Sequence, residues 1–156
     1  MNKDYTFITQ SPLETKKIAK SLSIFLLKSK NTFAKAPIIF LEGNLGSGKT
    51  TFLQGFSKAL KIKNKISSPT FTIIKRFKIP KKLSTFENFY HIDCYRLKNE
   101  KEILKLGLEE IINNPKNIVA IEWPEKIKKF LPKKGIKVHF QFLSLNKRKI
   151  KIKINV

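Results

Sequence analysis

Eight consecutive residues, Gly43–Thr50, match the complete phosphate-binding pattern G-x-x-x-x-G-K-[ST], called the P-loop below. Glycines allow a tight turn that aims successive backbone N–H groups at one anion. Lys49 is expected to reach the β- and γ-phosphates, and the Thr50 hydroxyl to bind Mg²⁺. The motif therefore predicts a site for a nucleoside triphosphate and Mg²⁺, with these cofactor-binding candidates: Gly43, Gly46, Gly48, Lys49 and Thr50.

Two acidic residues end apolar runs that are typical of buried strands. Asp93 ends the run 89–93, and Glu122 ends the run 117–122. Because the carboxyl ends of parallel strands meet at the edge where ligands bind, we expect the two carboxylates near the metal. One would hold Mg²⁺, directly or through water, and the other would orient it or help to position the attacking water. Asp93 and Glu122 are therefore candidate catalytic and metal-binding residues, and the sequence does not say which contacts the metal directly.

A third candidate lies in the loop that follows the P-loop helix, where Ser68, Pro69 and Thr70 are consecutive. Many nucleotide hydrolases keep a γ-phosphate-sensing switch at this place, so the Thr70 hydroxyl is a candidate catalytic group. An ordinary proline turn explains the same residues equally well. His91 shares a strand face with Asp93 and is more typical of a packed, hydrogen-bonded histidine than of a general base.

The elements that must position these residues alternate between strands and helices. An apolar run before the P-loop predicts a buried strand, and helical spacing after it predicts a helix. Ser11, Pro12 and Glu14 form a helix start signal. The expected strands are 5–9, 36–41, 71–77, 89–93, 117–122 and a terminal hairpin of 136–142 and 148–154; the expected helices are 12–26, 51–60 and 100–114, the last interrupted near Gly107.

This order predicts an α/β protein with a three-layer α/β/α arrangement of the P-loop NTPase type. We expect a mostly parallel central sheet with a C-terminal antiparallel hairpin, whose one wet face is rich in lysine. At 156 residues, the chain 1–156 is expected to form a single domain.

The composition limits the remaining possibilities. The formal net charge is +22, but the cations are almost all lysines spread along the whole chain, which suggests a compositional bias more than a dedicated nucleic-acid face. The one cysteine, Cys94, excludes an internal disulfide and suits a reducing cytosol. No apolar run is long enough to span a bilayer, so we expect a cytoplasmic protein with no membrane partner.

Four segments together resemble the TsaE (YjeE) family of small bacterial ATPases in tRNA threonylcarbamoyladenosine biosynthesis. They are Gly-Asn-Leu-Gly-Ser-Gly-Lys-Thr-Thr, Ser-Pro-Thr-Phe-Thr, His-Ile-Asp-Cys-Tyr-Arg-Leu and Ile-Glu-Trp-Pro-Glu, in that order. The resemblance implies a Mg-dependent protein that binds ATP and hydrolyses it slowly. It implies TsaD and TsaB as partners, with tRNA reached indirectly through their complex and with no DNA partner.

By matching position, the resemblance implies that residues 46–51, which add Ser47 and Thr51 to the candidates above, bind phosphates and that Glu122 lies close to the metal. It also implies that Ser11 and Asn146 occupy places where family members approach the nucleotide. Asn44, Ser47 and Cys94 depart from the usual family residues. The main alternative is a small P-loop kinase of a metabolite or nucleoside, although this chain shows no arginine-bearing lid. A GTPase is disfavoured because the chain lacks the Asn-Lys-x-Asp motif that recognises the guanine base. A protein that only binds RNA is disfavoured because it would not need a P-loop.

Overall fold

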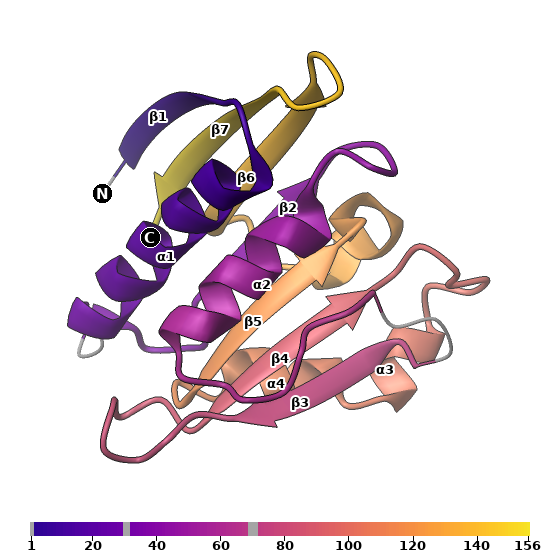
Figure 1. Ribbon diagram of the computed structural model, residues 1–156. Coiled ribbons are helices and arrows are strands. Elements are labelled where there is room, and N and C mark those ends of the chain that lie inside the picture. Colours follow the sequence, from indigo (N-terminus) through magenta and orange to yellow (C-terminus); the bar gives the residue numbers. More distant parts are fainter. Residues whose placement is uncertain (1, 30–31, 69–71) are drawn as a thin grey trace.

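The computed structural model describes residues 2–29, 32–68 and 72–156, which form one seven-stranded sheet with helices on both faces (Figure 1). The strand order across the sheet is β1-β7-β6-β2-β5-β4-β3. This arrangement confirms the predicted α/β class. The strands are β1 (Asn2–Thr9), β2 (Ile38–Glu42), β3 (Ile74–Lys78), β4 (Asn88–Asp93), β5 (Asn117–Glu122), β6 (Gly135–Phe142) and β7 (Arg148–Asn155).

The sheet is parallel in its centre and antiparallel at both sides. Strand β2 pairs in parallel with β5 and β6, and β4 pairs in parallel with β5. The pairs β1–β7, β6–β7 and β3–β4 are antiparallel. The expectation of a mostly parallel sheet is therefore right only for the central strands. The short connection from β3 to β4 explains one difference, because a parallel pair would need a long crossover there.

The face of the sheet turned toward the viewer in Figure 1 carries helices α1 (Pro12–Lys28) and α2 (Lys49–Ala59). Their apolar stripes pack on strand residues such as Leu41 and Ala120 in the larger of two apolar clusters. The two helices approach closely at Gly55, where a Cβ would stand 2.5 Å from the carbonyl oxygen of Lys16. A glycine at this position is therefore required by packing, since any side chain would push the helices apart.

The opposite face carries three short helical segments, α3 (Glu102–Lys105), α4 (Leu108–Asn113) and the 3-10 helix η2 (Pro124–Phe130). They cover a second apolar cluster built on alternate residues of the same central strands, such as Phe40 and Ile121. Strand β5 is buried at every residue because both of its faces are covered. The three-layer arrangement predicted from the sequence is thus present.

The local signals in the sequence correspond to the observed helix ends. The Ser11 hydroxyl accepts a hydrogen bond from the Glu14 backbone N–H at 3.2 Å, and Pro12 opens α1. Gly107, at φ 84°, separates α3 from α4, as its place in the predicted helix 100–114 suggested. Helix η2 was not among the expected elements. Within the described parts of the chain, no helix combines the length and the apolar character needed to cross a membrane.

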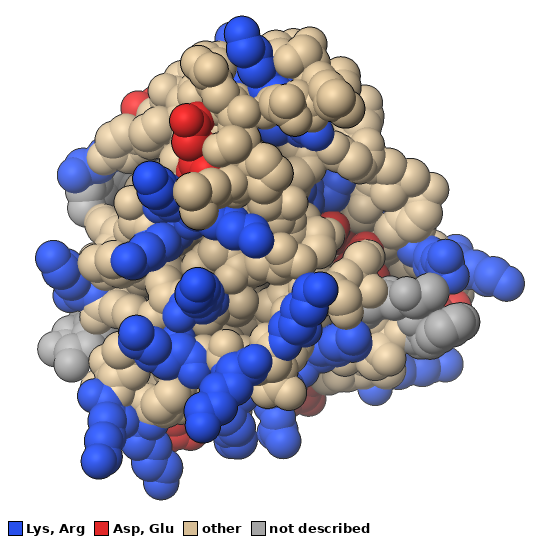
Figure 2. All heavy atoms as spheres, in the orientation of Figure 1, with Lys and Arg blue, Asp and Glu red and all other residues tan. Residues whose placement is uncertain are grey.

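The charge of the chain is distributed over the molecule. Figure 2 shows lysine and arginine side chains scattered over the face that carries α1 and α2, more densely in its lower half, with uncharged residues between them. Lys17, Lys20 and Lys58 are basic residues on these two helices. On this face, therefore, the net charge does not mark a particular binding surface.

Candidate functional site

The P-loop connects the end of β2 to the start of α2. Helix α2 begins at Lys49, and its N-cap is Gly48 at φ 106°. Within the turn, the Ser47 backbone N–H donates to the Asn44 carbonyl oxygen at 3.1 Å. The first residues of α2 line a cavity, and the unpaired N–H groups and dipole of a helix start favour an anion at such a place.

Gly43 is the glycine on which the path of the P-loop depends most. Its φ is +148°, and a Cβ there would lie 2.7 Å from the Phe140 carbonyl oxygen and 2.8 Å from the Ser47 hydroxyl. Phe140 belongs to β6, the neighbour of β2, so the chain leaves the sheet by passing directly over that strand. A side chain at position 43 would collide with backbone that cannot move without disturbing the sheet.

We expect Gly43→Ala to lower the free energy of unfolding by about 3 kcal/mol, from steric overlap and an unfavourable φ together. Gly46→Ala is the matched control, since Gly46 also has a positive φ, of +74°, but a Cβ there would meet no described atom within 4 Å. It should cost only about 1 kcal/mol. Urea unfolding of the two variants measures the difference, and equal losses would contradict this account.

Lys49 is buried, with 5% of its surface exposed. Its ammonium donates to the carbonyl oxygens of Gly43 at 2.5 Å and Asn44 at 3.0 Å, so the P-loop itself holds the charge in place. Burial lowers the pKa of Lys49, and the nearby carboxylates of Glu122 and Asp93 partly oppose this. The result is a largely desolvated cation at the start of α2, where a buried charge interacts more strongly with an anion than in water.

A cavity of about 280 Å³ opens between the P-loop and the carboxyl ends of β4 and β5. Its wall combines the start of α2 with two acids and two aromatic residues. The lining residues are Leu45, Gly46, Gly48, Lys49, Thr50, Thr51, Ser68, Asp93, Tyr95, Glu122, Trp123 and Arg148. One cavity therefore contains cationic, hydroxyl and carboxylate groups that the sequence places far apart.

Asp93 and Glu122 end β4 and β5 at the same level, because these residues are partners in the parallel register. Both lie on the sheet face that α2 covers. Residues an even number of positions apart in a strand share a face, and Phe89, before Asp93, and Ala120, before Glu122, belong to the apolar cluster under that helix. The acids are 9% and 3% exposed. The structure thus places side by side the two carboxylates that the sequence nominated separately.

Each carboxylate is held by a specific partner. The Asp93 carboxylate accepts from the Ser68 hydroxyl at 3.0 Å and from the Tyr95 backbone N–H at 3.0 Å. The fully buried His91 contacts the Glu122 carboxylate through Nε2 at 2.8 Å. His91 is therefore the packed, hydrogen-bonded histidine that the sequence suggested, and its contact holds the Glu122 carboxylate in one orientation.

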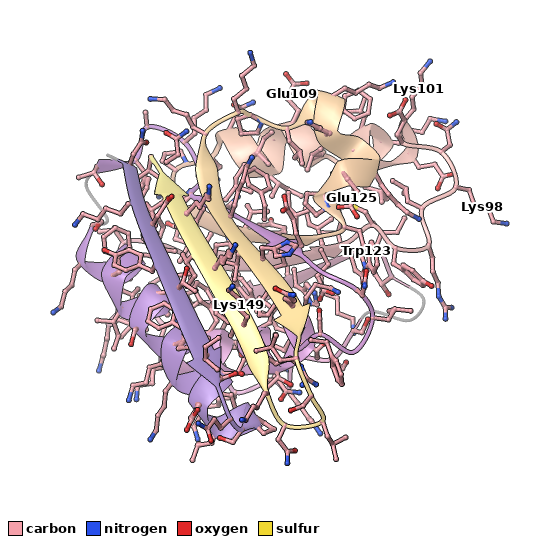
Figure 3. The ribbon with its side chains drawn as sticks, turned by 90° about the horizontal axis from the view of Figure 1, so that it is seen from above. Lys98, Lys101, Glu109, Trp123, Glu125 and Lys149 are labelled. Carbon is pink, nitrogen blue, oxygen red and sulfur yellow. The ribbon has the colours of Figure 1, made fainter. Side chains whose placement is uncertain are left out.

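Trp123 forms the wall of the cavity beside Lys49. The Lys49 ammonium lies 4.7 Å from the centroid of the Trp123 ring, and the Tyr95 ring lies 5.0 Å from it on centroids. Trp123 has φ 58°, a left-handed conformation that is uncommon for a bulky residue. Figure 3 shows this corner of the molecule from above, with Trp123 and Glu125 labelled. The turn after β5 thus aims the indole ring at the P-loop lysine.

A second, smaller cavity of about 50 Å³ adjoins the P-loop and shares Gly48, Thr51 and Arg148 with the larger cavity. Ser11 at the start of α1 and Asn146 in the β6–β7 turn both line it, together with Pro12, Thr15, Gly48, Thr51, Leu145 and Arg148. The structure therefore brings Ser11 and Asn146 to one place beside α2, although 135 positions separate them in the sequence (146 − 11).

The other nominated residues divide into two groups. Gly43 and Ser47 line neither cavity, since Gly43 packs under Phe140 and Ser47 is buried with 2% exposed surface. Thr70 lies outside the described residues, so its proposed switch role stays a prediction. Ser68, Tyr95 and Arg148 line the larger cavity but were not among the candidate residues from the sequence. Ser68 could have been chosen because it belongs to the same loop as Thr70, whereas nothing in the strand pattern distinguished Arg148.

Cys94 follows Asp93 but does not belong to the reactive groups of the site. It is fully buried, and burial raises the pKa of its thiol from 9.0 to about 12. At pH 8 only about one thiol in 10,000 is then ionised, and the thiolate is the reactive form.

We expect an aromatic disulfide reagent to modify the folded protein at Cys94 at least ~100-fold more slowly than the urea-unfolded protein. Equal rates would contradict the observed burial.

The donors in the larger cavity suit Mg²⁺ bound together with a phosphate chain. The described residues contain no cluster of three or more histidine, cysteine or acidic side chains that could hold a metal alone. Mg²⁺ usually takes one or two protein ligands and completes its shell with phosphate oxygens and water. The Thr50 hydroxyl and the Asp93 and Glu122 carboxylates, which share one cavity with Lys49, are a donor set of that kind.

Fold and site together define an α/β protein of the P-loop type, with a glycine loop between a central parallel strand and a helix. Residues 9–150 match the family model of the threonylcarbamoyl adenosine biosynthesis protein TsaE. The chain therefore belongs to the TsaE family.

Individual relatives agree with this assignment. The tRNA threonylcarbamoyladenosine biosynthesis protein TsaE of Rickettsia bellii is 39% identical over 142 residues, covering 90% of this chain and 89% of the relative. The Rickettsia prowazekii protein of the same name is 43% identical, over 71% of this chain and 73% of the relative. The crystal structure of YdiB from Bacillus subtilis superposes with a TM-score of 0.71 at 30% identity, covering all of this chain and 88% of YdiB.

Proposed function

We propose that this protein is a Mg-dependent ATPase that binds and slowly hydrolyses ATP. In this role it supports a TsaB–TsaD complex that installs N6-threonylcarbamoyladenosine on tRNA in the cytoplasm. The family places the chain in tRNA threonylcarbamoyladenosine biosynthesis. The observation that carries the rest is the complete P-loop opening on a cavity that also contains Asp93 and Glu122. Ser11 and Asn146, on the adjoining cavity, are proposed to approach the nucleoside part.

The proposed roles follow from the position of each group. The N–H groups at the start of α2 and the Lys49 ammonium bind the phosphates, in a site where an anion gains from partial desolvation. Thr50 and one of the two carboxylates hold Mg²⁺, which neutralises charge on the β- and γ-phosphates when bound. Glu122, oriented by His91, positions the attacking water. Asp93, held by Ser68 and the Tyr95 N–H, keeps a fixed direction toward the same space.

The single tryptophan provides a direct test of nucleotide binding. Trp123 lies on the cavity wall beside Lys49, so Mg·ATP should change its fluorescence with a saturable dependence on concentration. Adding purified TsaB and TsaD should then raise ATP turnover severalfold and permit tRNA modification. A protein without any binding response to Mg·ATP would overturn the ATPase proposal. Phosphate transfer to an added nucleoside would instead favour the kinase alternative.

A further inference from the structure

Arg148, at the start of β7, makes a set of contacts that join two distant parts of the chain. Its Nη1 donates to the carbonyl oxygens of Ser144 at 2.7 Å and Lys147 at 3.0 Å, and more weakly to Leu145 at 3.3 Å. Its Nη2 donates to the Gly46 carbonyl oxygen in the P-loop at 3.2 Å. One guanidinium therefore binds both the β6–β7 turn and the P-loop, and Arg148 is 102 positions from Gly46 along the sequence.

The surroundings of Arg148 place it between the two cavities. It lines both the larger cavity at the P-loop and the smaller cavity of Ser11 and Asn146. Its side chain passes Gly48, and its guanidinium lies over the Phe142 ring at 4.6 Å from the centroid. Its buried Nε has no hydrogen-bond partner among the described residues, although both terminal nitrogens of the same guanidinium have partners. A buried N–H donor without a hydrogen-bond partner is unusual in a folded protein.

We propose that Arg148 is a positioning residue that couples the β6–β7 turn to the P-loop, so that both contact one nucleotide from a fixed relative position. The inference rests on the proposed nucleotide-binding function. Arg148 holds the turn, and hence Asn146, at a fixed distance from the loop that receives the phosphates. A ligand that spans both cavities gains from this preorganisation, whereas a bare phosphate chain, which needs only the P-loop, does not.

The geometry requires arginine specifically. The planar guanidinium offers several N–H groups in a rigid fork, so it can satisfy carbonyls on two segments at once and still stack on an aromatic ring. A lysine ammonium has the same charge, but as a point donor on a flexible stem it cannot reproduce this bridge. Charge and coupling are therefore separable by substitution.

The experiment compares binding of Mg·ATP and Mg·tripolyphosphate, followed by Trp123 fluorescence, in the wild type, Arg148→Met and Arg148→Lys. We expect both variants to lose about tenfold in affinity for ATP and less than about threefold for tripolyphosphate. Lys149→Met is the matched control. It removes the same charge one position along β7, on the opposite face of the strand, where Figure 3 shows Lys149. This control should bind both ligands as the wild type does.

Other outcomes have distinct meanings. Equal loss of both ligands in Arg148→Met, with recovery in Arg148→Lys, would make Arg148 a simple phosphate cation and overturn the coupling. Wild-type binding in both variants, with only a lower melting temperature, would make it a cap of the turn and also overturn it. If Arg148→Met does not fold, Arg148→Lys alone still tests the proposal, through the ratio of its affinities for Mg·ATP and Mg·tripolyphosphate compared with that of the wild type. A wild type that binds neither ligand would instead remove the proposed function on which the inference rests.

Discussion

Lys49→Met is expected to weaken Mg·ATP binding by about 100-fold while leaving the fold intact. A charge-assisted hydrogen bond is worth about 1.5–3 kcal/mol, and Lys49 is placed to make more than one with a triphosphate. Methionine keeps the apolar stem beside Trp123, so the change removes the charge and little of the packing. The affinity is measured by titration of Trp123 fluorescence or by calorimetry.

The stability of the Lys49 variant separates binding from folding. Burial lowers the pKa of Lys49, which means that the folded structure disfavours its charged form relative to water. Methionine also removes the hydrogen bonds to the Gly43 and Asn44 carbonyl oxygens, which opposes that gain, so the melting temperature should change by only a few degrees. Lys58→Met is the matched control, because Lys58 is an exposed residue on the same helix. If Lys49→Met binds ATP as tightly as Lys58→Met does, the site assignment fails.

Glu122→Gln is expected to slow ATP hydrolysis by about 100-fold or more, with a change in ATP affinity of less than about tenfold. A positioned carboxylate that handles the attacking water typically contributes about 10²–10⁴-fold to the rate. Glutamine has nearly the same shape and can still accept a hydrogen bond from His91, so it tests the charge more than the packing. Single-turnover hydrolysis and equilibrium binding, measured on the same preparation, give the two effects separately.

The control for Glu122 is Glu87→Gln. Glu87 is an exposed acid paired with Lys116, immediately before β4. A surface pair of this kind contributes little, so this variant should hydrolyse ATP as the wild type does. Equal losses of binding and hydrolysis in Glu122→Gln would make Glu122 a ligand of the bound metal in both states. Unchanged hydrolysis would remove it from the reaction.

Much of the architecture could be predicted because its signals are local. Ser11 and Pro12 start α1, and Gly107 interrupts the helical segment where it was expected to. Strand β5 was predicted with its observed bounds, because a continuous apolar run between polar residues marks where a buried strand begins and ends. The pairing of β1 with β7 was not predicted, because partner choice at a sheet edge depends on contacts between distant segments.

The P-loop, the two acids and the family resemblance could be identified from the sequence alone, because each depends on residues that are close together in the chain. The fold was needed to show that Asp93 and Glu122 are neighbours, through the parallel register of β4 and β5. The fold was also needed to show that His91 holds Glu122 and that Arg148 reaches Gly46. Those contacts join segments that the backbone brings together only when the sheet forms, and no local pattern of residue types encodes such a distance.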